Sequence, residues 1–166
     1  MDDLTYMRMA LALAREAAEA GEVPVGAVLV WEDGRVVGRG RNHRESGKNA
    51  LAHAELEAID EACRTLGGWR LWKGTLYVTL EPCPMCAGAI VNARIPRLVY
   101  GAADPKAGSV KSVTELFRLP YNHRPEVTSG VLEDECSDLL RDFFRSLRSP
   151  KQLRKDEPEA ETELLL

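Results

Sequence analysis

The chain carries one histidine, one glutamate and two cysteines whose types and spacing suit a catalytic metal site. His53-Ala54-Glu55 is followed further along by Pro82-Cys83-Pro84-Met85-Cys86. A structural zinc site uses four protein ligands, whereas a hydrolytic site uses three and keeps the fourth position for water. One histidine and two cysteines leave that position open, so the pattern predicts a zinc ion held by His53, Cys83 and Cys86.

Glu55 adds a carboxylate that need not bind the metal. Zinc lowers the pKa of a bound water towards neutrality, and a nearby carboxylate can accept the released proton. The same group can then deliver protons to a ring nitrogen and to a departing amine. We therefore expect Glu55 to be a proton shuttle in the hydrolysis of an aromatic amidine.

Other interpretations of these residues remain open. A single C-x-x-C pair is weak evidence, because structural zinc ribbons and redox pairs also contain it. A ribbon would need a second pair and has no use for Glu55, but a non-catalytic zinc module that binds RNA is an alternative. His43 and His123 lack a ligand neighbour at metal spacing, so each is interpreted as a substrate contact or an ordinary surface histidine.

Apolar periodicity and turn residues divide the chain into alternating helices and strands. One predicted helix would carry His53 and Glu55 in its first turn, and another would begin at Cys83. Unpaired N–H groups and the positive end of the dipole favour thiolates at such helix starts. The predicted helices cover residues 4–20, 52–66 and 83–92, and the predicted strands cover 25–31, 35–41, 75–80 and 97–102.

Length and composition favour one compact domain. A chain of 166 residues can bury a full core without disulfides. Cys63 and Cys136 fall in apolar helical patterns, which predicts small buried hydrophobic side chains in a reducing compartment. No apolar run reaches membrane-spanning length, and residues 1–9 lack a basic segment followed by an apolar core. We therefore expect a cytoplasmic protein.

The net charge of −4 hides an uneven distribution. Residues 156–166 contain five acids and no Lys or Arg, and without them the net charge would be about +1. The basic residues elsewhere are interpreted as phosphate contacts, with a merely solvated surface as the alternative. They gather in two stretches, Arg35, Arg39, Arg41, Arg44 and Lys48, and then Arg94, Arg97, Lys106, Lys111, Arg118 and Arg124.

Beyond the metal motifs, several blocks resemble the bacterial tRNA-specific adenosine deaminases of the cytidine deaminase superfamily. The resemblance covers nearly everything from Met7 to Arg148, and it implies a three-layer α/β/α sandwich with a mixed sheet of about five strands and a homodimeric enzyme. Free-base deaminases acting on guanine or cytidine share the metal motifs but fewer of the other blocks. Those blocks are residues 22–28, 40–42, 52–55, 75–89, 104–108, 122–124 and 142–145.

The resemblance also implies a function for individual residues. Such enzymes convert adenosine to inosine at the wobble position of a tRNA anticodon, with arginine tRNA as the expected substrate. His53, Cys83 and Cys86 would hold one zinc ion per subunit, and Glu55 would move the proton. Asn42 and Asp104 match positions that contact the flipped base and the RNA beside it. The deaminase domain is expected over residues 1–150, followed by a charged tail, 151–166, whose composition predicts disorder.

Overall fold

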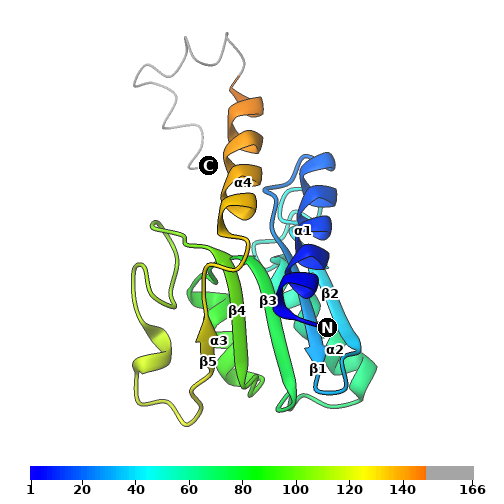
Figure 1. Cartoon of the computed structure of the whole chain (residues 1–166), viewed down its shortest axis with the longest axis vertical. Helices are drawn as coiled ribbons and strands as arrows, with labels where there is room; N and C mark the ends of the chain where they lie inside the picture. The colour runs from blue at the N-terminus through cyan, green and yellow to red at the C-terminus, as the bar shows by residue number, and fades with distance from the viewer. Residues whose placement is uncertain (149–166) are drawn as a thin grey trace.

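The computed structural model describes residues 1–148, which form a five-stranded sheet covered by helices on both faces. Figure 1 shows α1 in front of the sheet, α2 and α3 behind it, and α4 rising above it. The helices are α1 (Asp3–Glu19), α2 (Ala54–Leu66), α3 (Pro84–Asn92) and α4 (Glu133–Leu147), with a short 3-10 helix, η1 (Leu116–Arg118). The strands are β1 (Gly26–Trp31), β2 (Val36–Arg41), β3 (Gly74–Leu80), β4 (Arg97–Ala102) and β5 (Glu126–Thr128).

The strand order, β2-β1-β3-β4-β5, makes the sheet mixed. Strand β1 pairs antiparallel with β2 and with β3, while β3–β4 and β4–β5 are parallel. The carboxyl ends of β3 and β4 therefore lie at one edge of the sheet, and ligands of open α/β sheets bind at such edges. The predicted three-layer sandwich and its mixed sheet are confirmed. The predicted tail, residues 151–166, lies outside the described residues.

Each face of the sheet has its own apolar core, because successive strand side chains point to opposite faces. Leu76 and Val78 of β3 pack under α2 and α3, whereas Tyr77 between them packs under α1. The core under α2 and α3 also includes Leu29, Ala58, Ala62, Ile90 and Leu98. The opposite core includes Tyr6, Met7, Leu11, Val28 and Val99, with the fully buried thiol-bearing Cys136 of α4.

Two glycines of β2 let α2 lie directly on the sheet. A Cβ added at Gly40 would lie 2.0 Å from the carbonyl oxygen of Ala54, and one at Gly38 would lie 2.0 Å from that of Ala58. Real Cβ atoms do not approach backbone oxygens so closely, so larger residues would push the helix away. This close packing fixes the first turn of α2, which carries Glu55.

The predicted helices are confirmed, but their first residues differ from the prediction. Helix α2 begins at Ala54, and His53 before it is the N-cap in an extended conformation, with φ −86° and ψ 149°. Helix α3 begins at Pro84, a residue suited to the first helical position, and Cys83 is its N-cap. The placement of His53 within the first helical turn was therefore wrong, whereas Glu55 does lie there.

An ion pair joins α1 to the sheet on the face away from α2 and α3. The guanidinium of Arg97 donates to both carboxylate oxygens of Asp3, at 2.9 and 2.7 Å, and the Tyr77 hydroxyl donates to the same carboxylate at 2.7 Å. The hydrogen bonds from Arg97 hold the pKa of Asp3 below its usual value. Arg97 thus forms an ion pair within the fold, and its interpretation as a phosphate contact stays a prediction.

None of the helices in the part of the chain that the structure describes combines the length and the apolarity needed to cross a bilayer. Cys136 is buried as predicted, while Cys63 is only half-buried on α2. Both thiols are free, as are Cys83 and Cys86. The absence of disulfides among these four cysteines agrees with the interpretation that two serve the core and two serve the site.

Candidate active site

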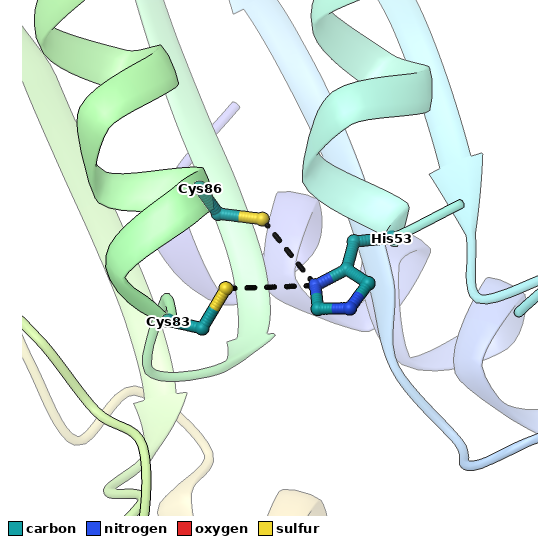
Figure 2. Close-up of side chains that lie close together, drawn as sticks. All are labelled: His53, Cys83 and Cys86. Atoms are coloured by element: carbon teal, nitrogen blue, oxygen red, sulfur yellow. Dashed lines mark hydrogen bonds between the residues drawn. The ribbon is translucent and has the colours of Figure 1, made fainter. Parts of the chain in front are cut away.

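The predicted metal ligands meet where α2 and α3 begin. Figure 2 shows the His53 ring facing the two cysteine side chains, with Cys83 before α3 and Cys86 in its first turn. The Nδ1 atom of His53 lies 3.6 Å from Cys83 Sγ and 3.5 Å from Cys86 Sγ. All three ligand atoms lie within 4.8 Å of one another, which is compatible with a shared ion.

Hydrogen bonds among these three groups shift the pKa of each of them. The bond from the Cys86 thiol, followed by that from the His53 ring, lowers the pKa of Cys83 to about 4. The same bond raises the pKa of Cys86, and burial adds to that effect. The bond to Cys83 also raises the pKa of His53. The site therefore already holds one thiolate, stabilised by neighbours that would themselves bind a cation.

The donor set fits zinc. Two thiolates and one imidazole are ordinary zinc ligands, and softness of sulfur disfavours magnesium or calcium at the same place. Three protein donors leave one coordination position for water, as in catalytic sites. The group combines residues from two helices, so binding an ion would also hold the starts of α2 and α3 together.

Glu55 is buried beside this group, in the first turn of α2, and is only 4% exposed. Burial raises the pKa of its carboxyl group, opposed by hydrogen bonds from its own backbone N–H and from Cys86. A carboxyl group whose pKa is raised towards neutrality is suited to take up and release a proton during turnover. Glu55 is not a member of the three-residue ligand group, although it interacts with the Cys86 thiol beside it.

A pocket of about 190 Å³ opens onto the metal group and Glu55. Typical small-molecule pockets measure about 300–1,000 Å³, so this one suits a single flat group such as a base. Its walls come from the segment before β1, the loop after β2, the end of β3 with Leu80 and Glu81, and the loop after β4. The lining residues include Val23, Val25, Asn42, Arg44, Asp104 and Ala107.

Asn42 lies on one wall and is 8% exposed. Its amide nitrogen donates to the carbonyl of Val23 at 3.2 Å, and its amide oxygen accepts from the backbone N–H of Arg44 at 3.0 Å. These two bonds distinguish the amide nitrogen from the amide oxygen and so fix the orientation of the Asn42 side chain. Each amide end still has capacity for a second hydrogen bond, which a ligand in the pocket could use.

Asp104 lies on the other wall, in the loop after β4. One carboxylate oxygen accepts from the backbone N–H groups of Lys106 and Ala107, at 3.0 and 3.3 Å, as aspartates commonly do in turns. The structure thus brings Asn42 and Asp104 to one pocket, together with the metal group and Glu55. Their contacts with a substrate remain predictions.

Two buried glutamates support these walls, and sequence reasoning missed both. Glu22 is 1% exposed and accepts from the backbone N–H groups of Glu45 and Ser46, in the loop that follows Asn42. Glu81 is 2% exposed and accepts from the loop that begins at Asp104. Both lie in blocks that resemble the family, residues 22–28 and 75–89, and each is an acidic residue near an apolar strand, where a buried charge requires a partner.

The remaining candidates play other parts. The ring of His43 contacts Glu57 and the carbonyl of Arg41, while His123 Nε2 lies 2.7 Å from the carbonyl of Ile95. Neither histidine belongs to the metal group. Of the predicted phosphate contacts, Arg44 lines the pocket, whereas Arg35 and Arg118 pair with Asp33 and Glu115.

Comparison with known proteins agrees with this site. The family model of the MafB19-like deaminases matches residues 1–148. The tRNA-specific adenosine deaminase of Bacillus subtilis is 52% identical over 151 residues, which cover 90% of this chain and 93% of that protein. A solved structure from a study of A-to-I editing by tRNA:A34 deaminases at the wobble position of transfer RNA superimposes with a TM-score of 0.79. It is 50% identical and covers 81% of this chain and 98% of its own.

A guanine deaminase with a solved structure, also from Bacillus subtilis, is less similar. It is 35% identical, with a TM-score of 0.61, and the match covers 77% of this chain and 84% of that one. The two matches share the fold, so the fold alone does not distinguish the two activities.

Proposed function

This chain belongs to the tRNA-specific adenosine deaminase family, and we propose that it hydrolyses adenosine to inosine at the wobble position of a tRNA anticodon, with arginine tRNA as the expected substrate. The observation that carries the proposal is the meeting of the His53, Cys83 and Cys86 ligand atoms with the buried Glu55 in one base-sized pocket. The matched residues cover 93% of the Bacillus subtilis relative.

One zinc ion per subunit is the proposed cofactor, held by His53, Cys83 and Cys86. Zinc supplies a water of lowered pKa, and hence a nucleophile at neutral pH. Because the pKa of Cys83 is lowered while those of Cys86 and His53 are raised, the protons that metal binding would displace are those of Cys86 and His53.

The proposed reaction moves two protons, and Glu55 is placed to move both. A water oxygen bonds to C6 of adenine while one proton passes by way of Glu55 to N1. The carbon–nitrogen bond then breaks, and the second proton leaves with the exocyclic nitrogen as ammonia, so that water and adenosine give inosine and ammonia. Burial raises the pKa of the Glu55 carboxyl group, which favours uptake of a proton by its carboxylate.

The proposed RNA contacts lie on the pocket walls. Asn42 would hydrogen-bond the base, because its amide is already oriented by Val23 and Arg44. Asp104 would contact the RNA beside the target nucleotide, and Arg44 offers a cation at the pocket mouth for a phosphate. A single-stranded loop suits such a pocket, because its bases can be turned out without breaking pairs.

The enzyme is further proposed to be a cytoplasmic homodimer whose deaminase domain occupies residues 1–150. The supporting observation for a dimer is a groove beside α3, lined by Val91, Asn92 and Tyr121 among others. Tyr121 is 52% exposed and Leu119 is 45% exposed, an arrangement that a second subunit would cover.

The test uses zinc-loaded protein and an anticodon stem-loop of arginine tRNA with adenosine at the wobble position. Inosine, measured by mass spectrometry, is expected from the wild type and not from Glu55→Gln, which keeps the shape of the side chain. A stem-loop carrying guanosine at that position is the substrate control. No inosine from a zinc-containing wild type would contradict the proposal.

Deamination of a free base is the second candidate, favoured by the similarity to guanine deaminase. The pocket of about 190 Å³ would accept guanine as readily as adenine on size alone. Ammonia release from guanine or cytidine, at a rate exceeding that from the stem-loop, would support this alternative.

A further inference from the structure

Glu81 is a buried carboxylate for which the proposed chemistry has no use. It directly follows β3 and precedes Pro82 and Cys83. One carboxylate oxygen, Oε2, accepts from three successive backbone N–H groups of the loop after β4. These are the N–H groups of Val110, Lys111 and Ser112, at 3.1, 2.9 and 3.0 Å.

The other oxygen, Oε1, reaches the start of the same loop. It accepts from the backbone N–H of Asp104 at 3.1 Å and from the Ser112 hydroxyl. Both ends of the loop, 104 and 112, are therefore tied to one side chain. Because hydrogen bonds to a charged group are about twice as strong as neutral ones, this carboxylate is a firm anchor.

The loop approaches Glu81 so closely that it needs a glycine. A Cβ added at Gly108 would lie 2.4 Å from Glu81 Cδ. The N–H of Ser109 also donates to the carbonyl of Pro82 at 2.9 Å, next to the metal ligand Cys83. The loop is thus held against the segment that supplies the metal site, with Asp104 and Ala107 facing the pocket.

We propose that Glu81 is a positioning residue that sets the place of Asp104 at the pocket wall, through the Asp104 N–H bond to Oε1, and thereby sets the affinity for the RNA substrate. The inference rests on the proposed function, because it assigns Asp104 a contact with RNA. Glu81 is among the residues that line the pocket, but it is only 2% exposed and both of its carboxylate oxygens accept hydrogen bonds from the loop, so its effect is expected to pass through the loop.

The substitution Glu81→Gln breaks this link selectively. The amide oxygen must face the three N–H groups of Val110, Lys111 and Ser112, since an NH2 group there would meet three donors. The NH2 group then faces the N–H of Asp104, donor against donor, although it can still donate to the Ser112 hydroxyl. The far end of the loop stays anchored while Asp104 loses its bond.

The matched control is Ser112→Ala, which removes a hydrogen bond from the same oxygen and leaves the Asp104 N–H bond intact. With the stem-loop substrate, Glu81→Gln is expected to raise KM about tenfold and to change kcat by less than about twofold. Ser112→Ala is expected to leave both constants near wild type, and zinc content is expected to be unchanged in both variants. In Glu81→Gln, the amide hydrogen of Asp104 should exchange faster than in Ser112→Ala.

A double variant decides whether Glu81 acts through Asp104. Asp104→Ala is expected to raise KM, and adding Glu81→Gln to it should raise KM by less than about twofold more, since coupled residues are non-additive. The proposal is overturned if the two effects multiply, if Asp104→Ala leaves KM unchanged, or if Ser112→Ala raises KM as much as Glu81→Gln does. Failure of the proposed function is a different result, because the wild type would then form no inosine before any variant is compared.

Discussion

The metal centre takes His53, Cys83 and Cys86 from the starts of two helices, whereas the pocket wall takes Asn42 and Asp104 from two loops. At the centre, short sequence motifs and helix geometry bring the ligand atoms together. At the wall, the two loops form neither helix nor strand around Asn42 and Asp104, and turn hydrogen bonds hold their backbones. The same pocket is therefore built by two kinds of local structure.

Each of the two loops donates backbone N–H groups to a buried carboxylate, which holds the loop in place. Glu22 accepts backbone N–H groups from the loop after Asn42, and Glu81 accepts those of the loop that begins at Asp104. Hydrogen bonds from several backbone amides to one charged carboxylate are strong, so they hold the loop in place. Changes at the centre should abolish the reaction, while changes at the wall should weaken substrate binding by degrees.

The largest expected effect is loss of the metal. Cys83→Ala should lower zinc content to well below one per chain and reduce turnover at least about a thousandfold, because no activated water remains. The melting temperature should also fall, since the metal joins α2 to α3. Zinc analysis, inosine formation and calorimetry measure these effects. Cys63→Ala is the control, because that half-buried thiol of α2 lies outside the metal group and should keep the zinc.

Glu55→Gln should separate metal binding from proton transfer within the centre. We expect full zinc content and a fall in kcat of about 10²–10⁴-fold, the usual contribution of a positioned acid or base. KM for the stem-loop should change little, since Glu55 is buried and is proposed to move protons rather than to hold the RNA. A parallel loss of zinc and activity would mean instead that Glu55 supports the metal site.

A smaller effect is expected at the wall. Arg44→Ala should weaken RNA binding and reduce the slope of log K against log salt by about 0.7, the value for one phosphate of a single strand. Titrations of the stem-loop at several salt concentrations measure the slope. Arg35→Ala is the control, because Arg35 pairs with Asp33 in the β1–β2 turn. An unchanged slope in Arg44→Ala would show that this arginine meets no phosphate.

The sequence predicted the centre because its information is local. The spacing of Cys83 and Cys86 and the helical pattern after each motif were enough to place the ligands at two helix starts. The error was one of boundary, since the extended backbone of His53 and the proline after Cys83 make both residues N-caps. Helix ends depend on such single-residue details, which periodicity does not resolve.

The wall could not be predicted in the same way. Nothing near Glu22 or Glu81 in the sequence indicates that each would accept backbone N–H groups from more than twenty residues away. Likewise, Arg97 looked like its basic neighbours, but the fold places it against Asp3, 94 residues earlier. Long-range partners of single polar residues depend on the tertiary structure, and only the resemblance to a family indicated Asn42 and Asp104.

The ion pair of Asp3 and Arg97 provides the smallest effect and a reference far from both regions. Arg97→Leu should lower the free energy of unfolding at pH 7 by roughly 1 kcal/mol, because both side chains are about a third exposed and solvent weakens the pair. Since Arg97 holds the pKa of Asp3 below its usual value, this stabilisation is present above about pH 4 and is lost as the pH falls through the lowered pKa. Urea unfolding at pH 7 should therefore show a lower free energy of unfolding for the variant than for wild type, and this difference should disappear near pH 2. A difference that persists near pH 2 would mean that the stabilisation comes from packing of the aliphatic part of the Arg97 side chain. Either way, kcat and KM at pH 7 should match wild type, because the pair lies under α1, on the opposite face of the sheet from α2 and α3.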